Sequence, residues 1–326
     1  MQYQNIPYMR LLLASGLLVL TSFFNGYSTQ KLTDIVVFAS LEKSKLLLAQ
    51  EDVYTDRWSA MDIDIRMQKA NSTKQELMNY IPTQARAWNE NEKELLYQIL
   101  SDYDRVIESQ AYHLNFPDTI FFIKTTMDEE LRGASAYTRA NAVIFNGEKI
   151  TSTDAQLPHL VVHELFHILS RHDPELRRAM YQIIGFELME EVTLTSRLAS
   201  TKLSNPDAPF NDSYIRLVNH GEEIECIMLL YANKEYNGGG LFDYLNVGLV
   251  KLTGMDQKQI DLQDGEPVIL QINQVPNFFD QVGKNTNYII NPEEIMADNF
   301  AFTLNGKNDL PNPEIIDEIK SHLRQQ

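Results

Sequence analysis

His163 and His167 stand four residues apart, and Glu164 follows the first of them, in the heptapeptide Val162–Ile168. On a helix, residues four apart lie on the same face, so both imidazoles can point at one metal ion. Glu164 lies one step round the helix, close enough to take a proton from a water beside that metal. The apolar residues around the three would bury the helix. These residues predict a buried metal site with a carboxylate base beside it.

The residues directly after the motif do not supply a third metal ligand. A catalytic zinc ion usually takes three protein ligands and keeps one position open. The extended pattern H-E-x-x-H-x-x-G-x-x-H needs a glycine and a third histidine, but this chain has Ser170 and Asp173 at those positions. His172 lies about 140° round a helix from His167, and Pro174 disfavours a longer helix. The third ligand is therefore expected elsewhere in the chain.

Two carboxylates in the downstream segment Asn291–Phe300 fit that role. Pro292 suits the first position of a helix, and Glu294 and Asp298 are four apart, so they share one helical face. An aspartate one turn after a ligating glutamate can accept the other N–H of a ligating histidine and so fix its tautomer. We therefore predict Glu294 as the third ligand and Asp298 as that partner. Glu293 remains a rival ligand, although it has no aspartate four residues later.

The combination of HELFH at His163–His167 with E-x-x-x-D at Glu294–Asp298 resembles the gluzincins, the thermolysin-like zinc metallopeptidases. The resemblance implies one catalytic zinc ion, with Glu164 as the general base and Asp298 as the partner of His163. It implies zinc ligation by His163, His167 and Glu294. The resemblance covers the catalytic core only. The 126 residues between His167 and Glu294 are far more than in thermolysin, so the fold of the intervening segment stays open.

The function implied by this resemblance is zinc-dependent hydrolysis of peptide bonds in peptide or protein substrates. Zinc would activate a water and polarise the scissile carbonyl, and Glu164 would pass the proton of the water to the leaving amine. Two alternatives remain. One is a non-catalytic zinc-containing binding protein with a zincin-like fold, and the other is a zinc amide or ester hydrolase that acts on non-peptide substrates.

A hydrolytic site also needs a hydrogen-bond donor for the oxyanion. Tyr288 stands six residues before Glu294 and is predicted to supply that donor. His172, His220 and Tyr137 are weaker alternatives. His159, one turn before His163, is expected to face solvent.

The elements that must position these residues begin with two strands. Residues Thr119–Lys124 form a β-rich apolar run, and Ala134–Phe145 suits an edge strand, of which Ala136–Phe145 matches the gluzincin edge strand best. Asn146-Gly147 is a turn signal, and helix-capping residues at Thr151–Asp154 precede the motif helix. An edge strand beside a metal helix can pair with an extended peptide. The predicted class is α+β with a zincin-like core: a small mixed sheet, the HExxH helix and a downstream ligand helix.

The rest of the chain is expected as additions to that core. Within the N-terminal region, Asn89–Leu114 is an amphipathic helix and the alternating Met61–Met67 suits a short strand. Glu187–Leu203 suits a helix and Pro267–Val275 a strand. The predicted organisation is a signal peptide at 1–28, a helical N-terminal region at 29–115, the zincin core at 116–204, an inserted lobe at 205–285, and the third-ligand and C-terminal helices at 286–326.

The composition and the N-terminal sequence limit which molecules the protein can bind and where in the cell it is expected. Lys and Arg number 28 and Asp and Glu 45, a net charge of −17, and this argues against nucleic acid as a partner. Cys226 is the only cysteine, so any zinc must be held by histidines and carboxylates. The uncharged run Leu11–Phe24 after Arg10 has the length of a signal-peptide core. We therefore expect an extracytoplasmic protein, or one anchored in a membrane if the segment is not cleaved.

Overall fold

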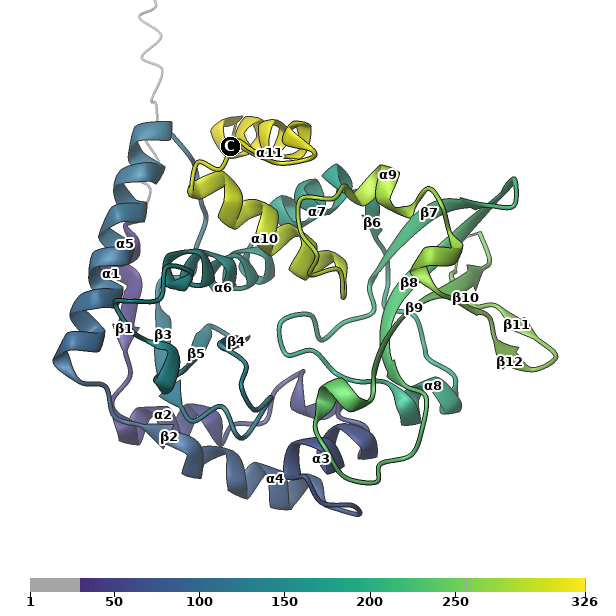
Figure 1. Cartoon of the computed structure of the whole chain (residues 1–326), viewed down its shortest axis with the longest axis horizontal. Coiled ribbons are helices and arrows are strands. Elements are labelled where there is room, and N and C mark those ends of the chain that lie inside the picture. The colour runs from purple at the N-terminus through teal and green to yellow at the C-terminus, as the bar shows by residue number, and fades with distance from the viewer. Residues whose placement is uncertain (1–29, 256, 326) are drawn as a thin grey trace, which may run out of the picture.

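The computed structural model describes residues 30–255 and 257–325. The predicted signal peptide at residues 1–28 lies outside the described residues. Within the described ranges, every helix is too short or too polar to cross a membrane. The described chain contains two large sheets, a separate two-stranded hairpin and the helices around them, and the predicted α+β class is confirmed (Figure 1).

The first sheet is mixed and has β3 (Ile120–Thr125) near its centre. β3 pairs in parallel with β1 (Val36–Phe38) on one side and with β5 (Ala142–Asn146) on the other. β4 (Ala136–Arg139) is antiparallel to β5 and forms the edge, and β2 (Ala85–Arg86) is antiparallel to the end of β3. Both faces of β3 are buried, which explains its continuous apolar sequence.

The expected single edge strand over Ala134–Phe145 is wrong, because the segment forms the β4–β5 hairpin. The chain reverses at Ala140, which has a φ of 48° in the left-handed region, and no strand continues through that conformation. Only β4 is an edge strand, and β5 is an interior strand between β3 and β4.

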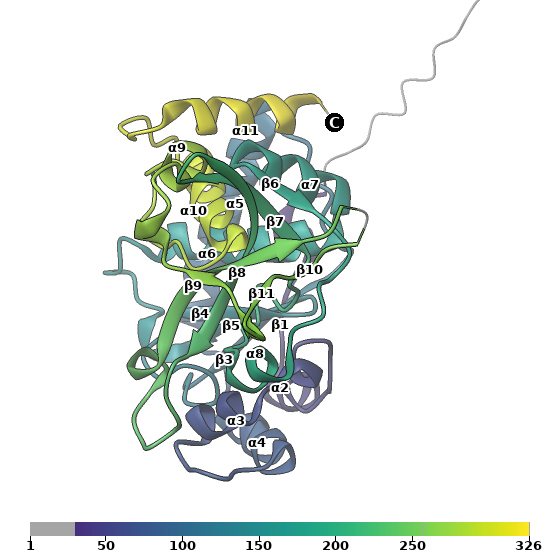
Figure 2. The same ribbon diagram turned by 90° about the vertical axis from the view of Figure 1, so that its right-hand side faces the viewer.

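Helices cover both faces of this sheet. α5 (Glu90–Gln110) begins at an Asn89–Glu92 capping box, and α6 (Leu157–His172) carries the HExxH motif and packs on the β4–β5 hairpin. α10 (Pro292–Leu304) lies between α6 and α11 (Pro313–Gln325), as Figures 1 and 2 show. The Phe166 and Phe300 rings, 5.2 Å apart, join α6 to α10. Apolar residues of the two helices and of β3 and β5 share one core.

The opposite face of the first sheet is covered by N-terminal elements. These are α2 (Leu41–Leu48), α3 (Ala60–Met67), α4 (Lys74–Tyr80) and the short 3₁₀ turns η1 (Thr55–Arg57) and η2 (Ile81–Gln84), whereas α1 (Leu32–Ile35) packs on α5 in the first core. The expected strand at Met61–Met67 is wrong, because these residues form α3. Ser59 caps α3 together with Asp62, and Asp62 also pairs with Arg66 one turn later. The alternating pattern concealed this helical i,i+4 pair.

The second sheet is antiparallel and lies to the right of the first sheet and of α6 and α10 in Figure 1, which brings it to the front in Figure 2. Its strands are β6 (Phe186–Leu188), β7 (Ser213–Asn219), β8 (Glu222–Ala232), β9 (Leu245–Thr253) and β10 (Gln259–Ile260), with β13 (Ile269–Leu270) also paired to β9. β11 (Leu262–Gln263) and β12 (Glu266–Pro267) form a separate hairpin. The remaining elements are α7 (Pro174–Ile183), α8 (Ser196–Thr201), α9 (Phe278–Val282), η3 (Gly147–Lys149), η4 (Leu241–Asp243) and η5 (Ile272–Gln274).

Two further predictions in this part of the chain need correction. The helix expected over Glu187–Leu203 is shorter, because its first residues pair with β7 as β6 and only α8 is helical. The strand expected over Pro267–Val275 is divided into the end of β12, β13 and η5. In both stretches the secondary structure changes after a few residues, because each part contacts a different element. A local pattern of apolar residues does not encode these tertiary contacts.

Candidate metal centre

Two helices far apart in the sequence bring the motif residues together. α6 ends before Pro174, and its residues His163, Glu164 and His167 are all buried. α10 begins at Pro292, and the side chain of Asn291 accepts a hydrogen bond from the Glu294 amide at 3.0 Å. This cap fixes the first turn of α10, so that the Glu294 carboxylate faces α6.

The three predicted ligands meet at one point between these helices. Oε2 of Glu294 is 2.9 Å from Nε2 of His163 and 3.5 Å from Nε2 of His167. One ligand atom from each of the three lies within 4.8 Å of the others. Zinc–ligand bonds of about 2.0–2.1 Å in a tetrahedral site place neighbouring ligand atoms about 3.3 Å apart. The observed separations of 2.9 and 3.5 Å lie on either side of that value.

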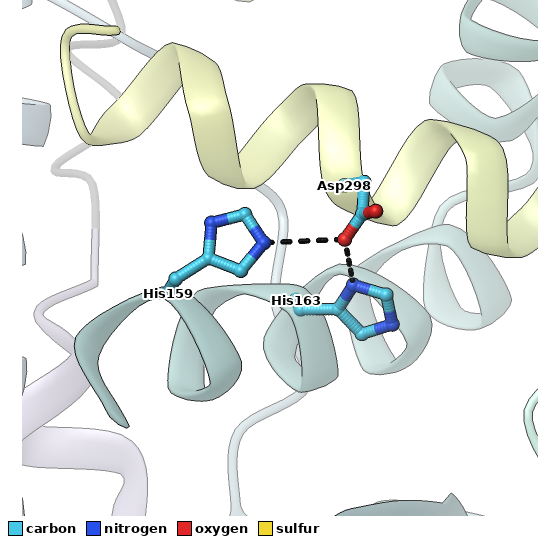
Figure 3. A group of neighbouring side chains, drawn as sticks. All are labelled: His159, His163 and Asp298. Carbon is cyan, nitrogen blue, oxygen red and sulfur yellow. Dashed lines mark hydrogen bonds and ion pairs between the residues drawn. The ribbon is translucent and has the colours of Figure 1, made fainter. Parts of the chain in front are cut away.

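Asp298 lies on the other side of the His163 ring (Figure 3). Its Oδ1 is 2.9 Å from Nδ1 of His163 and 3.1 Å from Nε2 of His159, and its Oδ2 accepts from the Thr286 hydroxyl. The structure therefore brings Asp298 to His163, the histidine that the family resemblance implies as its partner. His159, expected to face solvent, is only partly exposed and shares the carboxylate.

Glu293 lies on the other side of the His167 ring. Its Oε1 is 3.2 Å from Nδ1 of His167 and accepts from the Ser170 hydroxyl, and its Oε2 accepts from the Tyr181 hydroxyl at 2.5 Å. Glu293, a rival ligand in the sequence, is thus placed as the partner of His167, on the side away from Glu294. Each motif histidine therefore has one ring nitrogen bound to a carboxylate and the other directed at Glu294.

Two buried polar atoms at this point find no hydrogen-bond partner among the described residues. They are Nε2 of His167 and Oε2 of Glu164. A buried polar atom without a partner costs about 1–3 kcal/mol, so two such atoms beside one another are consistent with a bound ion or water between them. Two imidazoles and one carboxylate are a common donor set for catalytic zinc. The donor types, the separations and the unpaired atoms all fit a zinc ion.

The charges of the site shift several pKa values. Burial alone would lower the pKa of His163, but hydrogen bonds to Asp298 and Glu294 outweigh it and raise that pKa to about 10. Burial favours the neutral form of Glu294, yet the positive charge on His167 holds its pKa well below the ordinary value. Burial, followed by the charge of Asp207, raises the pKa of Glu164. The site thus concentrates negative charge around one buried point, which suits a cation.

The proposed oxyanion donors lie in different places. The ring of Tyr288 is 6.2 Å from that of His163, and 45% of the residue is exposed, so it stands at the solvent side of the site. Tyr137 is buried on β4 and donates to Oε1 of Glu129 at 3.2 Å. His172 is exposed at the end of α6, and His220 lies in the β7–β8 turn. Of these residues, Tyr288 is the one placed against a motif histidine.

Sequence reasoning missed two residues, Asn205 and Asp207, which follow α8. Nδ2 of Asn205 donates to Oε1 of Glu294 at 2.6 Å. Asp207 offers a carboxylate oxygen within 4.8 Å of ligand atoms of both Glu164 and His167. The sequence marks Asn205–Pro209 only as a loop with two prolines, and a loop composition contains no signal for contact with a site.

Comparisons of the chain with protein-family models, with curated proteins and with solved structures found no match.

Proposed function

We propose that this protein is an exported zinc-dependent peptidase with a zincin-like catalytic core of the gluzincin kind. The observation that carries the proposal is the meeting of His163, His167 and Glu294 around the unpaired atoms of His167 and Glu164. The proposed zinc ligands are Nε2 of each histidine and Oε2 of Glu294.

The carboxylates behind the two histidines support their role as ligands. Asp298 and Glu293 each accept a hydrogen bond from Nδ1–H, so the lone pair of Nε2 is free for a metal. This arrangement also fixes the orientation of each ring and increases its basicity. Ser170 and Tyr181 hold Glu293 in turn, and Thr286 holds Asp298.

The positions of the side chains support hydrolysis at this site. When bound, zinc supplies a positive charge that favours ionised Glu164, activates a water and polarises a carbonyl. Glu164 takes a proton from the attacking water and gives it to the leaving amine. Tyr288, beside His163 at the solvent side, donates a hydrogen bond to the oxyanion. The edge strand β4, next to α6, offers backbone groups to an extended peptide.

The test is a comparison of the wild-type protein with Glu164→Gln and His167→Ala. We expect one zinc ion per chain in the wild type and in Glu164→Gln, and a large loss of zinc in His167→Ala. Hydrolysis of a generic peptide library should fall about 10²–10⁴-fold in Glu164→Gln. Hydrolysis that survives in Glu164→Gln would contradict the assignment of the base. Zinc binding without cleavage of any peptide would favour a binding protein, and cleavage of amides or esters alone would favour a small-molecule hydrolase.

A further inference from the structure

The segment Asn205–Pro209, here called the covering segment, crosses the candidate metal centre between α8 and β7. One of its contacts orients the Glu294 carboxylate, and two others occupy groups that a peptidase needs free. We propose that the covering segment is an autoinhibitory element, and that Asp207 closes the site to substrate until the segment moves aside. This inference rests on the proposed function.

The first contact is with Glu294, the proposed third zinc ligand. Nδ2 of Asn205 donates to Oε1 of Glu294 at 2.6 Å, while Oε2 of the same carboxylate faces both histidines. The covering segment therefore occupies the one oxygen of Glu294 that the histidines leave available. It holds the carboxylate so that a single oxygen points at the metal position.

The second contact is with the open side of the site. One oxygen of Asp207 lies within 4.8 Å of ligand atoms of Glu164 and His167, the two residues with unpaired buried atoms. A catalytic zinc site keeps one position open for water and substrate. A carboxylate so close to the base and to a ligating histidine competes for that position.

The third contact is with the edge strand. Oδ1 of Asp207 accepts hydrogen bonds from the Thr138 amide at 2.6 Å and from the Thr138 hydroxyl at 2.7 Å. Thr138 is in β4, and its amide points away from β5 towards the covering segment. An extended substrate would need that outward amide to pair with the edge. One side chain thus blocks both the metal position and the strand that would hold a peptide.

Arg171 locks the covering segment against β4. Its Nη1 donates to the Ala140 carbonyl at 2.7 Å, and its Nη2 donates to the Thr138 hydroxyl at 3.0 Å. Nη2 also lies 3.4 Å from the carbonyls of Pro206 and Asp207. Because Arg171 lies on α6, the helix that carries the HExxH motif also holds the covering segment in place.

The ends of the covering segment are anchored independently of the site. Ser204, before it, bonds to the buried Asp62 through its amide at 2.8 Å and its hydroxyl at 2.9 Å. Asp212, after it, makes two 2.7 Å bonds with Arg177. A cavity of about 150 Å³ also adjoins the segment, with Ser170, Arg177 and Phe210 in its lining. The five residues therefore have fixed ends and room to shift between them, as a movable cover requires.

The experiment uses the zinc-loaded full chain with Asp207→Ala, and Asn211→Ala as the matched control. Asn211 lies in the same loop but contacts Glu191 through its backbone amide, at 3.2 Å, so its side chain can be shortened without loss of that bond. The probes are a short peptide hydroxamate, titrated by calorimetry, and a fluorogenic extended peptide. Loss of hydrogen bonds to a charged group changes an equilibrium by at least about tenfold. We expect at least that gain in hydroxamate affinity and in hydrolysis for Asp207→Ala, with unchanged zinc content, and no gain for Asn211→Ala.

Asp207→Asn is the second variant, in case Asp207→Ala does not fold. Its amide oxygen can still accept from Thr138 but has no charge, so we expect a smaller gain of the same sign. Equal affinity and hydrolysis in wild type and both Asp207 variants would overturn the inference, and so would a loss, which would make Asp207 a substrate-binding residue. Those results leave zinc binding intact, whereas failure of the wild type to bind zinc would overturn the proposed function as well.

Discussion

Arg66 and His167 each stand in a buried cluster of charged side chains, and the clusters differ in how their polar atoms are partnered. In the Arg66 cluster, Nε donates to Glu130 at 2.9 Å, Nη1 to Asp62 at 3.0 Å and Nη2 to the Tyr54 hydroxyl at 2.5 Å. Oδ1 of Asp62 also accepts from the Ser204 amide. Every guanidinium nitrogen is therefore bonded.

The His167 cluster is different, since Nε2 of His167 and Oε2 of Glu164 are buried without a hydrogen-bond partner among the described residues. A fully bonded buried cluster orders the segments that it joins, here α3 and the chain before the covering segment. A cluster with unpaired atoms around one point is arranged for a ligand. The comparison separates a structural charge cluster from a candidate functional one without reference to sequence motifs.

Glu129 shows that an unpaired atom alone is not enough. Its Oε2 is also buried and unpaired, and its Oε1 accepts from Tyr137. Burial raises the pKa of Glu129 to about 7, and burial also raises the pKa of Glu164, so a proton can occupy either carboxyl group. The histidines and the second carboxylate make the difference between the two sites.

The largest expected effect on stability is that of Arg66→Met. It leaves Asp62 and Glu130 buried without their cationic partner, which costs about 3–5 kcal/mol. The measurement is the free energy of unfolding in urea. Arg216→Met is the control, because the Arg216 pair with Glu187 is half exposed and should cost no more than about 1 kcal/mol. If both variants lost the same small amount of unfolding free energy, the structural role assigned to the Arg66 cluster would be contradicted.

Glu129→Gln should change the pH dependence of stability. The folded pKa of about 7 lies above the ordinary 4.5, so the protonated carboxyl stabilises the fold fully below pH 4.5. That contribution is lost as the pH rises through 7, a change of about 3 kcal/mol. Glutamine does not ionise, so the free energy of unfolding of the variant should not change in this way. Relative to the wild type, it should therefore rise by that amount between pH 4.5 and pH 8. A difference that stays constant across urea titrations at several pH values would contradict the protonated-carboxyl explanation.

Zinc should stabilise the fold through the His167 cluster alone. A ligand at 100 times its Kd adds about 2.7 kcal/mol to the free energy of unfolding. We expect this increment in the wild type and in Arg66→Met, and its loss in His167→Ala and after treatment with a chelator. Thermal unfolding with and without zinc measures it. An increment that persists in His167→Ala would place the metal elsewhere.

The smallest effects should come from the carboxylates behind the histidines. Asp298→Asn and Glu293→Gln keep the size of each side chain and weaken the acceptor for Nδ1–H. Each should lower zinc affinity about 10–100-fold, as measured by competition with a chromophoric chelator. Glu222→Gln, on the exposed β8 end, is the control. Unchanged affinity in both variants would mean that the ring orientations do not depend on these carboxylates.

Residue spacing alone could predict the parts of the site that lie within one helix, and the pairing of one helix with the other came from the resemblance to a known family. The i,i+4 spacing places His163 and His167 on one face of α6, and Glu294 and Asp298 on one face of α10, without any knowledge of the fold. Contacts such as those of Asn205 and Asp207 depend on where a loop passes, and neither periodicity nor propensity encodes that path. The error at Met61–Met67 has a different cause, because the local Ser59 cap and the Asp62–Arg66 pair favour a helix in a segment that also alternates apolar and polar residues.

The contact between α6 and α10 has a further consequence for the chain between them. α7 ends at Ile183 and α10 begins at Pro292, so the whole second sheet is a loop closed at its base by the two helices. The entropy of closing a loop grows only slowly with its length, so the outlying β11–β12 hairpin can vary in length at little cost to the site, whereas strands such as β7 and β9 share the core of the helices. A cross-link between the helices, such as a shared metal ion, would hold both ends of the loop. A chain cut at the β11–β12 turn would then remain one particle, with the two fragments joined at the metal centre.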